Sequence, residues 1–220
     1  MENPWHELNG KLPHVLESDR MFVDQHNENA NREHRIVVES IPEPFIGDPN
    51  SAKVVLLLLN PGHEDTDPCD HARSEVAKTM FKNLRHERQH FPFYPLGPSF
   101  KGTASARWWR RRLSGLIKEV GEEEILAEKL LAIEWFPYHS KYWKSPKCLW
   151  PSQQYTFHLA KTMLAKGATV IGMRSRKIWG DVDERLLRIP YLKNPRNVCV
   201  SRGNMEAGPW EALVAALKEE

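Results

Sequence analysis

The sequence KVVLLLLNPG, residues 53–62, joins an unbroken run of aliphatic residues to an Asn-Pro-Gly corner. Such a run, bounded by loop residues, is typical of a parallel strand that is buried on both faces of a sheet. In open α/β sheets, ligands bind beyond the carboxyl ends of the strands. The corner at Asn60 is therefore where we first expect a functional site.

The rest of the chain alternates apolar runs with helical patterns. We expect further strands at residues 130–136, 168–173 and 197–200. We expect helices at residues 72–88, 106–119 with Ser105 as the N-cap, 122–128, 152–166 and 209–218, and a helical turn at 176–179. This alternation predicts an α/β fold: a single three-layer α/β/α domain over residues 1–220, with a central four-stranded parallel sheet and residues 1–50 as an N-terminal helical extension.

The composition fits one compact domain. The 220 residues are 40% hydrophobic and 27% charged, and the longest apolar runs are too short to span a bilayer. The N-terminus is polar and acidic, unlike a secretory signal, and the three cysteines lie too far apart to form a CxxC pair. We therefore expect a reduced, cytoplasmic monomer without a membrane partner.

Positive charge is concentrated in the middle of the chain, although the net charge is only +2. Between Arg73 and Arg112 there are ten Lys or Arg residues and two acidic residues. A basic field beside aromatic residues suits a polyanionic partner. The alternative, commoner for any one charge run, is a solvated face with ordinary charges.

Motifs at three strand ends, taken in order, resemble those of the uracil-DNA glycosylase superfamily, most closely its mismatch-specific thymine/uracil branch. LLLLNPG resembles the first motif of that branch, a strand followed by G-[IL]-N-P-G. RWWRRRLSGL (107–116) matches its F-W pair and S-G-L in order. SRGN (201–204) stands in the slot of the second motif, where HPSP or MPSSS is usual, and is a clear departure from it. The resemblance spans about residues 45–217.

The resemblance implies a DNA glycosylase, which hydrolyses the N-glycosidic bond of a flipped-out base and leaves an abasic site. The partner would be DNA, either a duplex with a flipped base or a single strand. Asn60 would position the attacking water, as the matching asparagine does in the family. Because an amide is no strong base, stabilisation of the leaving group would carry more of the catalysis. The alternative for Asn60 is a simple turn after a strand.

Two residues shape the base pocket that the resemblance implies. Uracil-restricted relatives place a tyrosine near the position of Gly62, where it blocks substituents at pyrimidine C5; a glycine leaves room for them, or simply permits the backbone turn. Glu134 stands near the position of an asparagine that pairs with uracil. An ionised carboxylate would repel uracil O4 but accept from N4 of cytosine, so we expect a 5-substituted cytosine as substrate. The alternative is that Glu134 pairs with an Arg or Lys, or caps a helix.

Three more residues border this pocket in the resemblance. Phe93 or Tyr94 would stack on the flipped base, although loop aromatics more often pack against the core. His139 would contact the base or a phosphate, although a single histidine is usually structural or solvated.

The slot of the second motif contains Ser201, Arg202 and Asn204. Arg202 would donate to O2 of the departing base or to a phosphate, and Met205 would be the wedge that fills the emptied stack. The alternative is an ordinary strand-to-helix loop.

The segment RWWRRR (107–112) contains four arginines that would contact DNA phosphates: Arg107, Arg110, Arg111 and Arg112. The carboxylates and histidines do not fall into metal-ligand spacing, so we expect no metal or other cofactor.

Several functions stay open on the sequence. The leading one is a glycosylase for hypermodified cytosine, for instance in phage or other foreign DNA, and the conservative version is repair of uracil or mismatched thymine. Because the second motif departs, a catalytically silent nucleic-acid-binding protein on the same fold is an alternative. An unrelated α/β hydrolase or nucleotide-binding enzyme is another, although the chain has no GxxxxGKS loop or GxSxG elbow.

Overall fold

A four-stranded sheet forms the centre of the protein, for which the computed structural model describes residues 1–219. The strands are β1 (Phe45–Ile46), β2 (Val54–Leu57), β3 (Leu130–Ile133) and β4 (Thr169–Gly172), and their order across the sheet is β1-β3-β2-β4. β2 is parallel to both β3 and β4. All four side chains of β2 are fully buried, which explains its unbroken aliphatic sequence.

The sheet is mixed, so the prediction of an all-parallel sheet is wrong. Its fourth strand is β1, which runs antiparallel to β3. Residues 197–200, predicted to be a strand, are irregular: the Val200 N–H donates to the Arg112 carbonyl oxygen at 2.9 Å. Gly115 permits this approach, because a Cβ there would lie 3.0 Å from the Val200 carbonyl oxygen.

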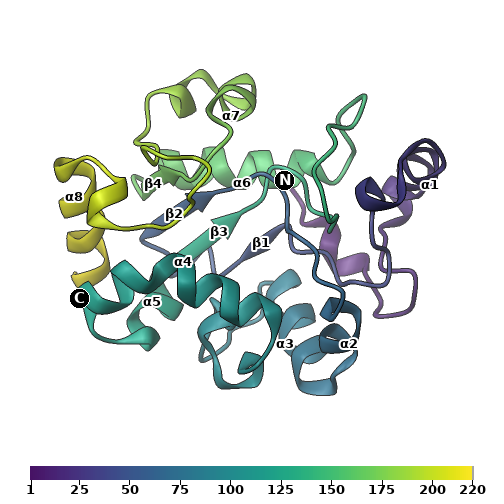
Figure 1. Ribbon diagram of the computed structural model, residues 1–220, viewed down its shortest axis with the longest axis horizontal. Coiled ribbons are helices and arrows are strands. Elements are labelled where there is room, and N and C mark those ends of the chain that lie inside the picture. Colours follow the sequence, from purple (N-terminus) through teal and green to yellow (C-terminus); the bar gives the residue numbers. More distant parts are fainter. Residues whose placement is uncertain (220) are drawn as a thin grey trace.

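Eight α-helices occur within residues 1–219 (Figure 1). They are α1 (Arg20–Asn29), α2 (Asp67–Ala72), α3 (Ser74–Leu84), α4 (Ala104–Val120), α5 (Glu123–Lys129), α6 (Gln153–Ala165), α7 (Arg176–Val182) and α8 (Ala207–Lys218). Short 3-10 turns cover Pro4–Glu7, Glu17–Asp19, Arg32–His34, Tyr94–Leu96, Pro98–Phe100, Glu184–Leu187 and Arg202–Asn204.

The helices lie on both faces of the sheet. α6 packs on β2, β3 and β4, whereas α8 contacts β2 and β4 from the other side together with α4, as Figure 1 shows. The predicted α/β class is therefore confirmed, and the arrangement is compatible with three layers.

Two helix boundaries differ from the prediction. The helix predicted at 72–88 corresponds to α3, which is shorter at both ends, and α2 before it was not predicted; the extended Arg73, with ψ 127°, separates the two. The N-cap of α4 is Thr103 and not Ser105, since the Thr103 hydroxyl accepts from the Ala106 N–H at 3.1 Å.

The N-terminal segment contains α1, as expected of a helical extension, and is packed into the domain. Trp5 is fully buried. The carboxylate of Asp19, also fully buried, accepts from the Tyr138 hydroxyl at 2.7 Å and from the Ser152 N–H at 3.2 Å. No helix in residues 1–219 is long and apolar enough to cross a membrane.

Candidate functional site

The Asn-Pro-Gly corner leaves the carboxyl end of β2 beside the chain that follows β3. Asn60 Nδ2 donates to the Pro61 carbonyl oxygen at 2.9 Å and to the Ser140 hydroxyl at 3.2 Å. A carbonyl oxygen only accepts, so the amide nitrogen must face Pro61 and Oδ1 must point away. Within residues 1–219 no hydrogen-bond donor reaches Oδ1, and Asn60 is partly exposed. This oxygen is therefore free to accept from a water or a ligand.

Gly62 borders open space. A Cβ at this position would have no atom within 4 Å, and the φ of Gly62 lies outside the left-handed region. The backbone turn therefore does not require glycine here. Gly62 is exposed, so the space beside it is open surface.

Glu134 is the first residue after β3, the strand that lies beside β2, and only 5% of its surface is exposed. Its Oε2 is buried and has no hydrogen-bond partner in residues 1–219. Burial raises the pKa of Glu134 well above its ordinary value; Arg174 opposes this shift and Glu43 adds to it. The sequence predicts an ionised carboxylate at Glu134, whereas its burial in the structure favours the neutral acid.

His139 is almost fully buried between two backbone carbonyl groups. Its Nδ1 lies 2.7 Å from the Gly62 oxygen and its Nε2 lies 3.0 Å from the Ile41 oxygen. Both oxygens only accept, so each contact needs a hydrogen on the ring nitrogen that makes it. The Glu43 carboxylate, 3.7 Å from Nε2, is its nearest acidic partner. His139 therefore fastens the Asn-Pro-Gly corner and is not directed at a ligand.

Tyr94 does not present its ring to solvent either. Its hydroxyl donates to Glu43 Oε1 at 2.6 Å, and its ring packs on Phe100 with 4.5 Å between centroids. Burial is the main factor that raises the pKa of Glu43, and the nearby His139 and the Tyr94 hydroxyl oppose it. Phe93 is fully buried against Trp109, with ring centroids 4.8 Å apart. Neither aromatic offers a free face for stacking on a base.

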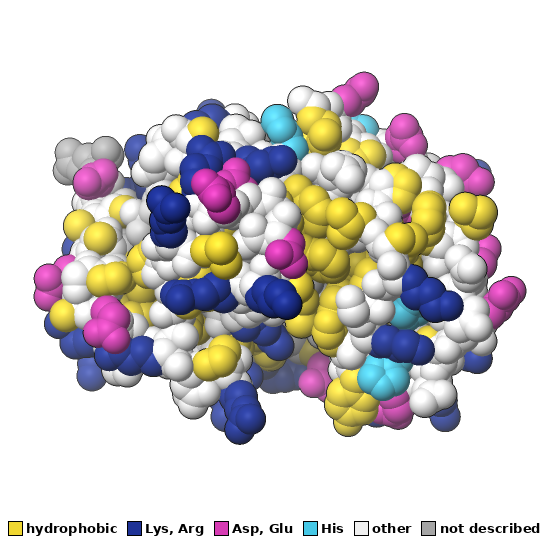
Figure 2. All heavy atoms as spheres, turned by 90° about the horizontal axis from the view of Figure 1, so that it is seen from above, with side chains coloured by type: hydrophobic (Ala, Val, Ile, Leu, Met, Phe, Trp, Pro, Cys, Tyr) yellow, Lys and Arg dark blue, Asp and Glu magenta, His cyan; other side chains and the backbone are white. Residues whose placement is uncertain are grey.

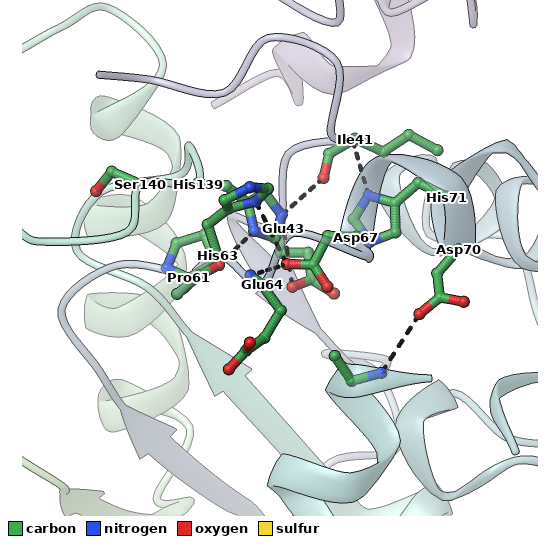
Figure 3. A network of polar contacts seen from close by, with 12 residues as sticks. Ile41, Glu43, Pro61, His63, Glu64, Asp67, Asp70, His71, His139 and Ser140 are labelled. Atoms are coloured by element: carbon green, nitrogen blue, oxygen red, sulfur yellow. Dashed lines mark hydrogen bonds and ion pairs between the residues drawn. The ribbon is translucent and has the colours of Figure 1, made fainter. Parts of the chain in front are cut away.

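A polar cluster that sequence reasoning missed surrounds His139 (Figure 3). Asp67 Oδ2 accepts from the Glu64 N–H at 2.7 Å and lies 3.5 Å from His63 Nδ1. Burial alone would raise the pKa of Asp67, but the nearby His63 and the hydrogen bond from the Glu64 N–H lower it overall. Within residues 1–219 no three His, Cys, Asp or Glu side chains are arranged to hold a metal ion.

His71 closes this cluster on the side of the N-terminal segment. Its Nδ1 accepts from the Ile41 N–H at 3.0 Å, and its ring meets that of His139 with centroids 5.4 Å apart. Burial, with the nearby His139, lowers the pKa of His71 to about 3. A neutral His71 ring agrees with its role as acceptor of the Ile41 N–H.

The slot of the second motif is a braced loop. Asn204 Oδ1 accepts from the Asn194 N–H at 2.9 Å, while Nδ2 donates to the carbonyl oxygens of Asn197 at 2.6 Å and Cys199 at 2.9 Å. Met205 is 1% exposed, so it does not protrude as a wedge.

The other two residues of that slot lie nearer the surface. Ser201 is half-buried against Gly115 of α4, where a Cβ would lie 3.0 Å from the Ser201 Cβ. Arg202 is exposed, lies over the Trp210 ring at 6.0 Å and pairs with Glu211 at 4.0 Å. Arg202 is thus the residue of this loop that can reach a polyanion.

The arginines of α4 divide into two groups. Arg110 pairs with Glu123 at 3.0 Å and donates to the Pro95 and Leu96 carbonyl oxygens, so its donors are already used. The other three differ in exposure: Arg107 and Arg111 are exposed, and Arg112 is half-buried with its guanidinium over Trp108. Arg107 and Arg111 remain candidates for phosphate contact.

Comparison with known proteins assigns no family to this chain. No protein-family model, no curated protein and no solved structure matches it. Its function therefore has to be inferred from the residues at the strand ends.

Proposed function

We propose that this protein is a DNA glycosylase, which hydrolyses the N-glycosidic bond of a flipped-out 5-substituted cytosine and leaves an abasic site. The observation that carries the proposal is the placement of Asn60 and Glu134 beyond the carboxyl ends of two adjacent parallel strands, β2 and β3. Asn60 offers an unpartnered amide oxygen, and Glu134 offers a buried carboxyl group whose pKa is raised by burial. Gly62 is exposed and has no side chain, so it would not block a substituent at C5.

The proposed chemistry follows from these two groups. Asn60 Oδ1 accepts from a water and holds it against C1′ of the sugar, where it attacks as the C1′–N1 bond breaks. The bonding electrons pass to the base. Glu134 donates its proton to N3 and accepts from the N4 amine, so that the base departs neutral. A proton from the water restores the acid.

The protonation of Glu134 also determines which bases it accepts. The neutral acid can pair with the edge of cytosine or of uracil, because it both donates and accepts. The ionised carboxylate rejects uracil O4. We therefore expect selectivity for cytosine over uracil to rise with pH while the rate on cytosine falls. Since Glu134 is 5% exposed, a base reaches it only when the side chains that cover it move.

The test is base release from a panel of DNAs that contain uracil, a G·T mismatch, cytosine, 5-hydroxymethylcytosine or glucosylated 5-hydroxymethylcytosine. Asn60→Ala should abolish release, and Asn50→Ala, a matched change in the exposed turn before β2, should not. Glu134→Gln should lower the rate by about 10²–10⁴, the usual share of a general acid. Release of uracil alone would refute the role of Glu134 and keep the glycosylase.

A silent nucleic-acid-binding protein is the second candidate, and one observation favours it. The loop 201–204 is braced by Asn204 and followed by a buried Met205, so it presents no wedge side chain at Met205. This candidate predicts DNA binding without base release from any member of the panel, and no effect of Asn60→Ala on affinity.

A further inference from the structure

A groove of about 540 Å³ lies at the end of β4, apart from the polar cluster around His139. It is bordered by the start of α7, by the segment 190–195 and by the loop that enters α8. Ser175, with a left-handed φ of 65°, turns the chain between β4 and α7. Arg174 and Arg176 on either side of this turn both line the groove.

The groove carries a net positive charge. Its charged lining residues are Arg174, Arg176, Lys193 and Glu206. Lys193 lies 3.4 Å from Glu206, but both side chains are largely exposed, so this pair is weak. The Arg174 Nε is buried and has no hydrogen-bond partner in the described part of the chain, residues 1–219. Two cations of the groove therefore lack a carboxylate partner within it.

The walls of the groove are apolar and rigid. Arg176 stacks over the Tyr191 ring with its guanidinium carbon 4.6 Å from the centroid. Tyr191 in turn packs on Gly172 at the end of β4, where a Cβ would lie 2.0 Å from the ring. The other apolar lining residues are Pro190, Leu192, Pro195, Met205 and Pro209. A planar cation held on an aromatic ring is pre-organised to bind a phosphate oxygen.

The groove continues into a basic surface. Figure 2 shows that Lys and Arg side chains gather on the half of this face that holds α7, beside a band of exposed hydrophobic side chains. The groove lies at the same edge of the sheet as Asn60 and Glu134, since β4 and β3 both run parallel to β2. A DNA strand that places one base at Asn60 and Glu134 would therefore pass near Arg174.

We propose that this groove binds the phosphodiester backbone of a DNA strand next to the flipped nucleotide, with Arg176 and Lys193 as the phosphate contacts. The inference rests on the proposed function, because it takes DNA as the ligand. It places the main backbone contacts at β4 and α7 and not on α4, where the RWWRRR motif lies. Three cations against one carboxylate, along an apolar channel, match the alternation of phosphate and sugar in a strand.

The experiment measures binding of fluorescein-labelled duplex and single-stranded DNA by anisotropy over a series of salt concentrations. Arg176→Ala and Lys193→Ala should each weaken binding about tenfold at low salt and reduce the salt slope by about one. Lys166→Ala is the matched control, since this exposed lysine precedes β4 at the opposite edge of the sheet.

Affinities and slopes equal to those of the wild type in both groove variants would overturn the inference, as would a wild type that binds no DNA. Direct binding of deoxycytidine monophosphate or inorganic phosphate, without DNA binding, would assign the groove to a free anion and overturn it too. Base release is measured separately on the same proteins. A wild type that binds DNA through the groove but releases no base keeps this inference and refutes the glycosylase.

Discussion

Replacing the buried carboxyl group of Glu134 by an amide should change how stability depends on pH. Burial raises the pKa of Glu134 well above the 4.5 of an exposed glutamate, so the folded protein holds a proton that the unfolded chain releases. As pH rises above 4.5, the folded state therefore binds one proton more than the unfolded state. The free energy of unfolding must fall through this window.

The expected magnitude follows from that one proton. The contribution of Glu134 falls by about 1.4 kcal/mol per pH unit, from pH 4.5 until the group ionises in the folded state. Glu134→Gln has no such proton, so its stability relative to the wild type should rise with the same slope. Arg174 and Glu43 shift Glu134 in opposite directions, and both remain in the variant.

The assay is urea unfolding of both proteins at a series of pH values, with Glu119→Gln, an exposed change on α4, as the control. The free energy of unfolding of Glu134→Gln minus that of the wild type should rise with pH above 4.5. The same difference for the control should show no such trend. A constant difference over that range would show that Glu134 ionises as readily in the folded state as in the unfolded chain. The proposed general acid would then be refuted.

Three further substitutions test the packing around the strand ends. Trp179→Phe removes a buried donor that lies 2.7 Å from the Leu58 carbonyl oxygen, and should lower the free energy of urea unfolding by about 1–3 kcal/mol; an unchanged value would contradict that bond. Gly172→Ala should displace Tyr191, lower stability by about 1–3 kcal/mol and weaken DNA binding in the anisotropy assay; native affinity would argue against the groove. Arg110→Ala should lower the thermal midpoint of unfolding while DNA affinity stays the same. An unchanged midpoint with weaker DNA binding would show that Arg110 is a phosphate contact after all.

The central strands could be predicted because their signal is local. Six consecutive aliphatic residues, 54–59, identify β2 without any knowledge of its neighbours. β1 could not be predicted, because its two residues lie within a stretch rich in proline and glycine and are extended only through pairing with β3. The apolar residues of 197–200 suggested a strand, but Val200 meets the backbone of α4 and not a strand of the sheet.

The candidate site was predictable only where its residues lie close behind a strand. Glu134 is the first residue after β3 and Asn60 the third after β2, so their positions follow from the ends of these strands. Glu43 and His139 come from separate loops and Asp67 from the start of α2, and no sequence spacing connects them. The only signal of this cluster is the presence of several titratable residues in segments bounded by proline and glycine.

The aromatics of the HFPFYPLGP loop illustrate the opposite error. The resemblance suggested a free face for stacking, yet Phe93 and Tyr94 are 0% and 2% exposed, in agreement with the alternative that loop aromatics pack against the core. Burial of a loop depends on what covers it, in this case α4 and the turns beside it, which local sequence does not report.

The most direct test of the glycosylase is the mass of the base released from phage DNA that contains glucosylated 5-hydroxymethylcytosine. The wild-type protein should release the intact glucosylated base and leave alkali-labile abasic sites, and Asn60→Ala should release none. If the folded wild-type protein releases no base from this DNA or from any other member of the panel, the glycosylase proposal is wrong and the strand ends serve binding alone.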